Sequence, residues 1–530
     1  MSPANNKMYQ RIHSLIQHLN EHLYEKEEIV RLVILSALAG ESIFLLGPPG
    51  TAKSMIARRL KFAFSEAKTF EYLMGKFSTP DEVFGPVSIS KLKDEDKYER
   101  MIEHYLPGAQ IVFLDEIWKA SPPIQNALLT VLNEKVYRNG EQEIPVDIRA
   151  LISASNELPL RGEGLEALWD RFLIRLVVGN IKAEIAFEKM LLLPGKMGHQ
   201  DPVPAELKIT HEEYAQWQKV ISEITVPPHV IGLVNQLRST INKRNATAED
   251  MDIMYVSDRR WRKIVQLMRA AAFLNGRKEV QVIDAFLIHH CIWDRTEQID
   301  ESEALVLGAI SQYGYQKLLN LTPIINEMNG LRDEIERETQ EIQMQTVTQL
   351  TEYKDEVETI FYQISGFWGD NHAYIRAQDL DKLEESEAFY VPIFERNGQV
   401  FRVFQNYGFL RTDHYEIAKP NKSQIYPLET QDIEKEVVVK KRPSDMLTRI
   451  WDGQIQLLLN RCDEGLRKLE AQKDADEDWL KQHLFVHSAL GQHVTESLGR
   501  TMDEILNLKL EIQKTQHLYE SIEAGEPRVG

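Results

Sequence analysis

The sequence predicts an α/β core with a parallel sheet, an all-α lid domain after it, and then a helical stalk that carries an inserted small β-rich module. Three observations favour this fold class. Apolar runs of strand length alternate with helical patterns up to about residue 180, as in βαβ units. Residues 186–305 are helical in pattern, with breaks at prolines. Beyond residue 306, apolar residues recur at three–four spacing on both sides of a short alternating stretch.

Two amphipathic helices are expected over residues 7–40, before the first strand. Their apolar faces are formed by two sets at helical spacing: Ile12, Leu15, Ile16 and Leu19, then Ile29, Leu32, Val33, Leu35 and Leu38. A short bend that contains Tyr24 lies between them. The core domain with these helices is expected to span residues 1–185.

A glycine-containing loop follows the first predicted strand, residues 43–46. The loop reads Gly47, Pro48, Pro49, Gly50, Thr51, Ala52, Lys53, Ser54, Met55. Its backbone N–H groups can turn toward an anion, Lys53 suits the β- and γ-phosphates, and Ser54 suits Mg²⁺. A helix beginning near Lys53 adds its positive dipole end. The loop therefore predicts a P-loop with ATP or ADP and Mg²⁺ as cofactors; a chance Gly-Pro turn before a helix is the alternative.

One position departs from the usual P-loop pattern, because Ala52 stands where a second glycine is common. Alanine fits there if its φ angle is negative. We expect a negative φ, since this residue opens a helix.

Polar residues follow two later predicted strands. Asp115 and Glu116 follow the apolar run 111–114, and Asn156 follows the run 150–155. We expect Asp115 to act on the Mg²⁺ shell, Glu116 to polarise the attacking water, and Asn156 to orient that water. A surface Asp-Glu pair is the alternative, which the preceding P-loop makes improbable.

An arginine follows a short acidic helix after Asn156. Arg171, directly after Asp170, is expected to be exposed and to reach into a neighbouring subunit's site as an arginine finger. An ordinary surface arginine is the alternative. Catalysis at a junction between subunits is therefore expected, with Glu116, Asn156 and Arg171 as catalytic residues.

Composition restricts the class of protein. A length of 530 residues suits three or four domains, and a hydrophobic content of 43% is enough for their cores. Only two cysteines, Cys291 and Cys462, argue against disulfides and for a cytoplasmic location. No secretory signal and no apolar run of ~18 residues is found, so no membrane span is expected. The net charge of −19 argues against a nucleic-acid partner.

Two insertions and a lid complete the first 305 residues. Residues 77–106 include a charged run, 91–97, for which a solvated loop is the alternative, and residues 135–149 suggest a hairpin around an Asn-Gly turn. The lid is expected over residues 186–305. Within it, Ser257 is a candidate N-cap of a helix whose first turn carries Arg259 and Arg260.

No catalytic pattern follows residue 306. Apolar residues at three–four spacing predict a long amphipathic helix that runs from Ile324 to Ile342 and on through Leu350, Tyr353, Val357, Phe361 and Ile364. Further amphipathic helices are expected within residues 446–490 and over residues 498–512. Asn397-Gly398 between alternating apolar residues predicts a hairpin, and residues 437–439 another strand. The predicted domains are thus a discontinuous helical domain, residues 306–365 and 441–530, and an inserted module, 366–440. The helices suit a coiled-coil assembly arm as well as a recognition arm.

The order of these motifs resembles the AAA+ ATPases and, within them, the MoxR group. The resemblance rests on the P-loop with its alanine and on residues 112–117, 128–134, 154–157 and 168–172. Residues 57–64, 70–74, 77–85 and 115–120 resemble the RavA branch (regulatory ATPase variant A). The likeness covers residues 8–300 and fades to a similar layout afterwards.

This resemblance implies a homo-oligomeric ring, expected to be a hexamer, that hydrolyses ATP to remodel or assemble a partner protein. It places an adenine contact at Tyr24, for which a hydrophobic plug is the alternative, and the lid's sensor arginine at Arg259, with Arg260 in reserve. The two insertions would face the ring pore. A von Willebrand factor A-domain protein is the implied partner, and the RavA branch adds an inducible lysine decarboxylase, weakly because the module differs.

Two other functions stay open on the sequence. The ATPase could be a slow timer in an adaptor whose C-terminal arm recruits or shields another protein. A DNA-remodelling motor is disfavoured by the acidic charge and by the lack of a basic, aromatic strip.

Overall fold

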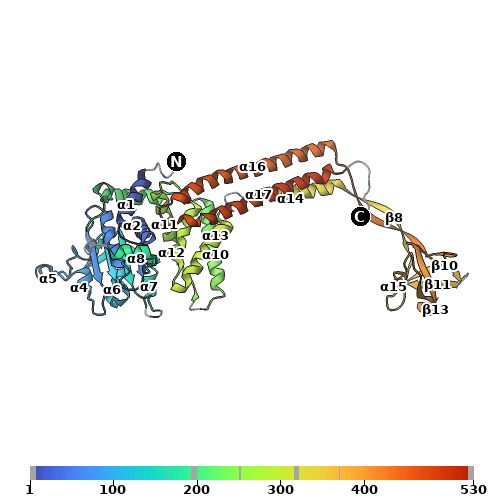
Figure 1. Ribbon diagram of the computed structural model, residues 1–530, viewed down its shortest axis with the longest axis horizontal. Coiled ribbons are helices and arrows are strands. Elements are labelled where there is room, and N and C mark those ends of the chain that lie inside the picture. The colour runs from blue at the N-terminus through green and yellow to red at the C-terminus, as the bar shows by residue number, and fades with distance from the viewer. Residues whose placement is uncertain are drawn as a thin grey trace. The chain divides into compact units, whose positions relative to one another are not determined.

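The computed structural model describes residues 7–160, 162, 164–192, 200–249, 252–315, 321–368 and 371–522. The chain divides into two compact units (Figure 1). The first comprises Met1–Ile325 and Leu458–Leu510, and the second comprises Asn326–Leu457 and Glu511–Gly530. Within the described residues, no helix combines the length and apolar character that crossing a membrane requires.

The predicted parallel α/β core is confirmed. Its five strands are wholly parallel and lie in the order β2-β3-β6-β1-β7. They are β1 Ser42–Leu46, β2 Thr69–Leu73, β3 Ile111–Asp115, β6 Ala150–Ser155 and β7 Phe172–Val177. β1 is buried at every residue because strands flank it on both sides. Parallel strands end at one edge of a sheet, so the segments after β1, β3 and β6 meet there.

Helices surround this sheet in the element order that the sequence suggested. The described helices of the core are α1 Lys7–Asn20, α2 Glu27–Ala39, α3 Lys53–Leu60, α4 Pro80–Phe84, α5 Ile89–Glu95, α6 Pro122–Glu134 and α7 Glu166–Trp169. An aromatic cluster fixes the end of α7. The ring of Trp169 lies 5.1 Å from that of Phe44 in β1 and 6.0 Å from that of Trp293. The segment that follows α7 is therefore anchored in the core.

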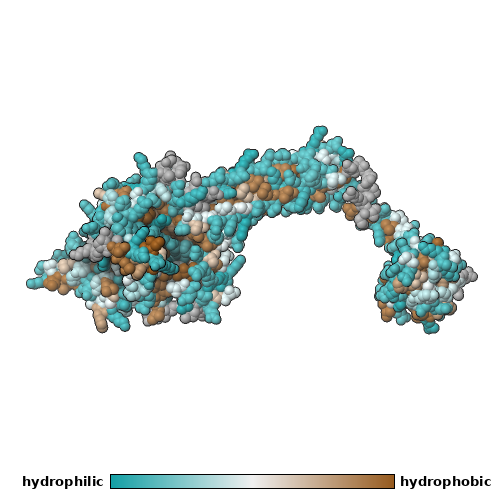
Figure 2. Space-filling view, in the orientation of Figure 1, coloured by the Kyte–Doolittle hydropathy of each residue, from teal (hydrophilic) through white to brown (hydrophobic). Residues whose placement is uncertain are grey.

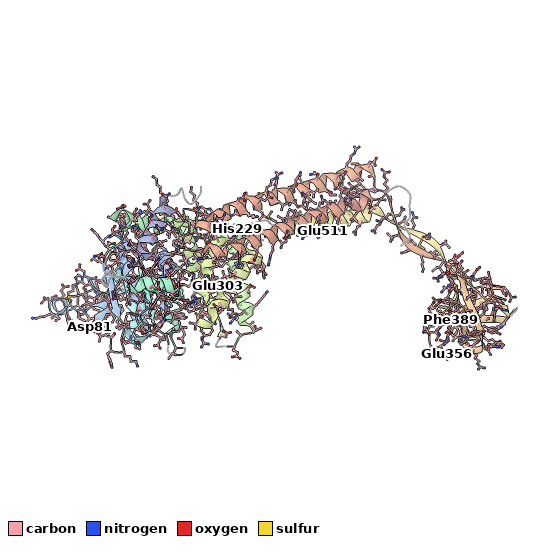
Figure 3. The ribbon with its side chains drawn as sticks, viewed as in Figure 1. Asp81, His229, Glu303, Glu356, Phe389 and Glu511 are labelled. Atoms are coloured by element: carbon pink, nitrogen blue, oxygen red, sulfur yellow. The ribbon has the colours of Figure 1, made fainter. Side chains whose placement is uncertain are left out.

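The two insertions contact each other. The predicted hairpin consists of β4 Val136–Asn139 and β5 Gln142–Pro145, and Gly140 adopts a φ of 65° in its turn. The side chain of Asn139 accepts a hydrogen bond from the Arg100 N–H at 2.6 Å and donates one to its carbonyl at 3.0 Å. Arg100 also pairs with Asp81, which Figure 3 labels. The amide of Asn139 thus joins the hairpin to residues 77–106.

The predicted all-α lid is also confirmed. Its helices are α8 Glu184–Leu191, α9 His211–Glu223, α10 Pro228–Asn245, α11 Asp258–Leu274, α12 His289–Ile292 and α13 Ile299–Tyr313. Ser257 caps α11 as expected, because its hydroxyl accepts a hydrogen bond of 3.1 Å from the Arg260 N–H. The capping fixes where Arg259 and Arg260 leave the helix.

Part of the C-terminal helical region belongs to the first unit. His483 follows α16 Asp445–Gln482 and precedes α17 Gly491–Glu520. Its Nε2 lies 3.1 Å from Asp284, which is buried and forms an ion pair of 2.6 Å with Arg277. Burial alone would raise the pKa of Asp284, but the charge of Arg277 and the hydrogen bond from His483 lower it to about 2. This cluster fastens residue 483 to the lid.

The second unit contains the β-rich module. Seven antiparallel strands lie in the order β15-β14-β13-β12-β11-β10-β9, and β8 pairs with β16 as a two-stranded ribbon. Their bounds are β8 Gln340–Leu350, β9 Glu352–Lys354, β10 Ile360–Trp368, β11 Asn371–Arg376, β12 Phe389–Asn397, β13 Val400–Asp413, β14 Glu416–Ala418, β15 Ile425–Pro427 and β16 Thr430–Lys440. The predicted hairpin at Gly398 and the strand at 437–439 are confirmed. Figure 3 labels Glu356 and Phe389 on this module, and the face of it seen in Figure 2 is mostly hydrophilic.

The predicted helix through Leu350 and Ile364 is wrong. α14 Thr322–Thr339 ends before Ile342, and residues 340–350 form β8. The three–four spacing there is coincidental, since residues 341–345, Glu-Ile-Gln-Met-Gln, also alternate polar with apolar residues, a strand pattern. Pairing with the β-branched run 437–439 selects the strand. The β structure therefore begins at residue 340, not 366.

Candidate active site

The P-loop joins β1 to α3 as predicted, and both of its glycines are required. A Cβ on Gly47 would lie 2.2 Å from the carbonyl oxygen of Val178. Gly50 adopts a φ of +83°, a left-handed conformation that glycine adopts without strain. The loop is therefore held close to the end of β7, with its backbone free to curve around an anion.

The expectation of a negative φ at Ala52 is wrong. Ala52 is the N-cap residue of α3 and adopts φ 71° and ψ 14°, in the left-handed region. Ala52 lies outside the helix, so the negative φ angles of a helix are not imposed on it. A left-handed alanine costs roughly 1–2 kcal/mol relative to the right-handed form. The loop thus retains the backbone shape usually supplied by glycine.

Lys53 is nearly buried in the loop that precedes it. Its Nζ donates to the carbonyl oxygens of Gly47 at 2.6 Å and Pro48 at 2.9 Å, and to Oδ1 of Asn156 at 3.1 Å. Burial lowers the pKa of Lys53, and the charges of Asp115 and Glu116 oppose that change. The ammonium lies inside the cradle, where it can reach a bound phosphate.

Ser54 and Asp115 meet across the loop. Ser54 Oγ lies 3.4 Å from Oδ2 of Asp115, at the end of β3. Burial raises the pKa of Asp115, as does the neighbouring Glu116 charge, while its hydrogen bond from the Glu116 N–H lowers it. A hydroxyl and a carboxylate are hard oxygen ligands, the type that Mg²⁺ prefers beside phosphate oxygens. The residues present therefore fit Mg²⁺.

Glu116 is held by three side chains. Its Oε1 accepts a hydrogen bond of 2.7 Å from Asn156, and its Oε2 lies 3.3 Å from Lys119 and 3.4 Å from Ser155. The residue adopts a φ of +54°, an uncommon conformation for a non-glycine residue. Such backbone strain persists where the surroundings fix it, often at catalytic sites.

The structure thus gathers five of the predicted residues at one edge of the sheet: Lys53, Ser54, Asp115, Glu116 and Asn156. We call these five the phosphate cluster. They come from the ends of two strands, β3 and β6, and from the start of α3. The remaining predicted P-loop residues, 47–52 and Met55, lie between β1 and the first turn of α3. This is the arrangement that the strand-end motifs predicted.

The bend with Tyr24 reaches the same neighbourhood. Tyr24 is half-buried between α1 and α2. Lys26 donates a hydrogen bond of 2.9 Å to the carbonyl of Gly179. Gly179 follows Val178, whose carbonyl oxygen leaves no room for a Cβ on Gly47. The bend and the P-loop therefore contact adjacent residues, while an adenine contact by Tyr24 stays a prediction.

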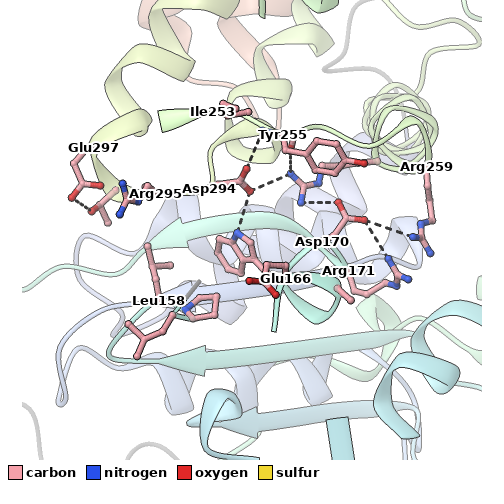
Figure 4. Close-up of a pocket in the computed structure, with 16 residues that line it drawn as sticks. Leu158, Glu166, Asp170, Arg171, Ile253, Tyr255, Arg259, Asp294, Arg295 and Glu297 are labelled. Atoms are coloured by element: carbon pink, nitrogen blue, oxygen red, sulfur yellow. Dashed lines mark hydrogen bonds and ion pairs between the residues drawn. The ribbon is translucent and has the colours of Figure 1, made fainter. Parts of the chain in front are cut away.

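Arg171 and Arg259 form a second cluster with Asp170, at a cavity of about 1090 Å³ between the core and the lid (Figure 4). Arg171 Nη1 lies 3.2 Å from Asp170, and Arg259 Nη2 lies 3.8 Å from it. The expected exposure of Arg171 is wrong, because only 10% of its side chain is accessible. Among the described residues, no hydrogen bond or ion pair joins this cluster to the phosphate cluster.

The two lid arginines differ sharply. Arg259 is 47% exposed and donates to Asn133 at 2.8 Å. Arg260 is 1% exposed, and it lies 3.0 Å from Asp170 and 3.6 Å from Asp294. Both arginines line the cavity, but Arg260 is paired with two carboxylates. Arg259 therefore stays the sensor candidate, with Arg260 in reserve.

Sequence reasoning missed the acidic partners of these arginines. The sequence identifies Asp170 only as the residue before Arg171, and no motif identifies Asp294. Asp294 accepts from Trp169 Nε1 at 3.1 Å and from Arg175 at 2.6 Å. Burial alone would raise its pKa, but Arg175 and Arg260 lower it. The only sequence feature that could have predicted this pairing is the position of Asp170 directly before Arg171, the candidate arginine finger.

The comparisons with known proteins agree with this geometry. A family model described as the MoxR domain in the MoxR-vWA-beta-propeller ternary systems matches residues 10–219, and an AAA lid domain matches residues 229–306. The chain is 33% identical over 322 residues to the uncharacterized protein MJ0079 of Methanocaldococcus jannaschii, covering 61% of this chain and 80% of that protein. It is 34% identical over 282 residues to MJ0812 of the same organism, covering 53% and 71%.

A third relative carries a functional name. The chain is 28% identical over 315 residues to the chaperone MoxR1 of Mycobacterium tuberculosis, covering 56% of this chain and 80% of that protein. Matches to the MoxR and AAA lid domains in succession fit the order of core and lid in the structure. With its P-loop, strand-end carboxylates and helical lid, this chain belongs to the MoxR-type AAA+ ATPases.

Proposed function

We propose that this chain hydrolyses ATP at the junctions between subunits of a homo-oligomeric ring, expected to be a hexamer, to remodel or assemble a partner protein. The separation of its two clusters supports this most. The phosphate cluster lies at the edge of the sheet, whereas Arg171 and Arg259 lie at the cavity beside the lid. One subunit therefore offers a phosphate cradle and, elsewhere, two arginines for a second subunit's phosphate.

Each residue of the phosphate cluster has a chemical role in this proposal. Bound Mg²⁺–ATP supplies the transferable phosphoryl group and part of the charge that stabilises its transfer. Lys53 and the loop N–H groups bind the phosphates, and Ser54 and Asp115 offer oxygen ligands. Glu116 takes up a proton from the attacking water, and Asn156 holds Glu116 in position. Arg171 and Arg259 are assigned to the neighbour's γ-phosphate.

The partner is proposed from the family description. The matched MoxR domain is defined in systems that contain a vWA protein, so we propose a vWA-domain partner. The lysine decarboxylase of the RavA branch stays a weaker proposal. We also propose a cytoplasmic location, which the two free, buried cysteines suit. No nucleic-acid partner is proposed, because the chain carries a net charge of −19.

An ATP-switched adaptor is the second candidate function. The β-rich module holds none of the residues of either cluster, so it is free to bind another protein. In an adaptor, ATP would control partner binding, and the partner would leave the hydrolysis rate unchanged. In a remodelling ATPase, the partner would alter that rate.

Two substitutions test the ATPase itself. Lys53→Ala is expected to lose nucleotide binding, since it removes the cation inside the cradle. Glu116→Gln is expected to keep ATP binding and to lose turnover by a factor of ~10²–10⁴. Glu157→Gln, at an exposed neighbouring position, is the matched control and should hydrolyse ATP normally. Equal ATP affinity for wild type and Lys53→Ala, or near-normal turnover in Glu116→Gln, would contradict the site.

A further inference from the structure

One carboxylate is shared between the lid and the candidate finger. Asp170 accepts hydrogen bonds from the Ser257 hydroxyl, 3.2 Å from each of its oxygens, and lies 3.0 Å from Arg260 Nη2. Ser257 and Arg260 belong to the lid. On its other side, the same carboxylate lies 3.2 Å from Arg171 Nη1 (Figure 4). The lid therefore contacts Arg171 through Asp170.

Arg260 is fixed in place by a second carboxylate. Its Nη1 lies 3.6 Å from Asp294 and donates to the Tyr255 carbonyl at 3.1 Å. Asp294 in turn pairs with Arg175, which is fully buried. A buried arginine needs such compensation, because an unpaired charge in the interior is very costly. Because Asp294 and Tyr255 also belong to the lid, Arg260 moves with the lid, and it contacts Asp170 only while the lid is docked on the core.

The two arginines compete for the charge of Asp170. Arg260 and Ser257 make three contacts with it, whereas Arg171 makes one; the buried Nε of each arginine has no hydrogen-bond partner among the described residues. With Arg260 in place, the charge that Asp170 presents to Arg171 is largely neutralised. If Arg260 withdrew, Arg171 would be the nearest remaining cation, since Arg259 lies 3.8 Å away. The hold on Arg171 would then strengthen.

We propose that Arg260 is a positioning residue for the neighbouring subunit's ATP. While Arg260 is paired with Asp170, Arg171 is free to leave that carboxylate for the γ-phosphate of the adjoining subunit. Lid movement that withdraws Arg260 makes Asp170 retain Arg171 and slows the neighbour's site. This inference rests on the proposed trans role of Arg171, and it assigns Arg260 a task that needs no contact with nucleotide.

The first test asks in which subunit Arg260 acts. Arg260→Gln rings should hydrolyse ATP about tenfold more slowly, the effect of strengthening one charge-assisted contact by ~1.4 kcal/mol. Their affinity for ATP should be unchanged. Mixed with Glu116→Gln subunits, they should regain turnover, because Arg260→Gln subunits supply Glu116 and the other subunits supply a released Arg171. Mixed rings that regain nothing would place the defect at the subunit's own site and overturn the inference.

The second test asks whether Asp170 carries the effect. Asp170→Asn added to Arg260→Gln should restore turnover, since the amide cannot retain Arg171 by charge. Arg244→Gln is the matched control, because Arg244 forms lid ion pairs with Asp252 and Glu301, away from Asp170. It should hydrolyse ATP normally. A double variant as slow as Arg260→Gln, measured on rings of equal mass, would overturn the inference.

Two further measurements keep these results interpretable. If Arg260→Gln fails to assemble, Ser257→Ala, which removes only the hydroxyl, should show a several-fold loss that mixing reverses; a loss that mixing leaves unchanged overturns the inference. Mixing Arg171→Ala with Glu116→Gln subunits separates the two proposals. If that mixture regains turnover and the Arg260→Gln mixture does not, only the positioning role fails. If neither regains it, the trans role of Arg171 fails as well.

Discussion

Asn156 donates a hydrogen bond of 2.7 Å from its side-chain amide to Oε1 of Glu116. The oxygen of the same amide accepts a hydrogen bond of 3.1 Å from Lys53. One amide therefore connects Lys53, the proposed phosphate-binding residue, with Glu116, the residue proposed to activate water. If Lys53 binds phosphate as proposed, its Nζ turns toward the nucleotide, and this contact would link nucleotide binding to the position of Glu116.

Asn156→Ala should lower turnover by about 10- to 100-fold while ATP affinity stays close to normal. Glu116 loses its shortest hydrogen bond, and a misplaced base reduces general acid–base catalysis. The measurement is steady-state hydrolysis together with equilibrium binding of ATP. Asn126→Ala, on the exposed face of α6, is the control. Unchanged turnover in Asn156→Ala would show that the amide only fills space.

Ala52→Gly should raise the apparent midpoint of thermal unfolding of the nucleotide-free protein. Relief of a left-handed alanine is worth roughly 1–2 kcal/mol, more than the ~0.4–1 kcal/mol that glycine costs through the unfolded chain. Ala57→Gly, within α3, is the matched control and should lower that midpoint. The same sign of change in both variants would contradict the strain assigned to Ala52.

Removal of the β-rich module should leave ATP hydrolysis and ring formation intact. Residues 351–429 can be replaced by an Asn-Gly linker, because Leu350 and Thr430 are register partners at the end of the β8–β16 ribbon. The predicted module of 366–440 would be the wrong deletion, since it removes β16 and leaves β8 unpaired. Turnover and sedimentation are the measurements.

The same truncated chain tests partner binding. With Glu116→Gln to hold the ATP state, the full chain should capture a protein that the chain without residues 351–429 does not. Loss of both turnover and assembly in the truncated chain would instead show that the module is structural.

The sequence predicted the parts of this protein that depend on local pattern. The buried strands that end at Asp115 and at Ser155, just before Asn156, could be predicted because parallel strands give continuous apolar runs. The Ser257 cap could be predicted because it depends only on the Ser257 hydroxyl and the N–H of Arg260, three residues along the chain. The phosphate cluster follows from these local features, since parallel strands end at a common edge.

Features that depend on distant contacts were not predictable in this way. The strand at Gln340–Leu350 exists because it pairs with residues 430–440, far along the chain. Burial of Arg171 depends on Asp170 and on a lid that begins after the core. The left-handed φ of Ala52 is set by the loop on one side and the helix on the other. None of these leaves a short sequence pattern.

The central claim is that each ATP site is completed by Arg171 from another subunit. The most direct measurement mixes Arg171→Ala with Glu116→Gln subunits, each expected to be nearly inactive alone. An arginine finger contributes roughly 10³–10⁵ to turnover in related chemistry, so junctions that combine an intact Glu116 with a neighbour's intact Arg171 should restore hydrolysis. If mixed rings form and hydrolysis is not restored, Arg171 does not act in trans, and the exposed Arg259 becomes the candidate.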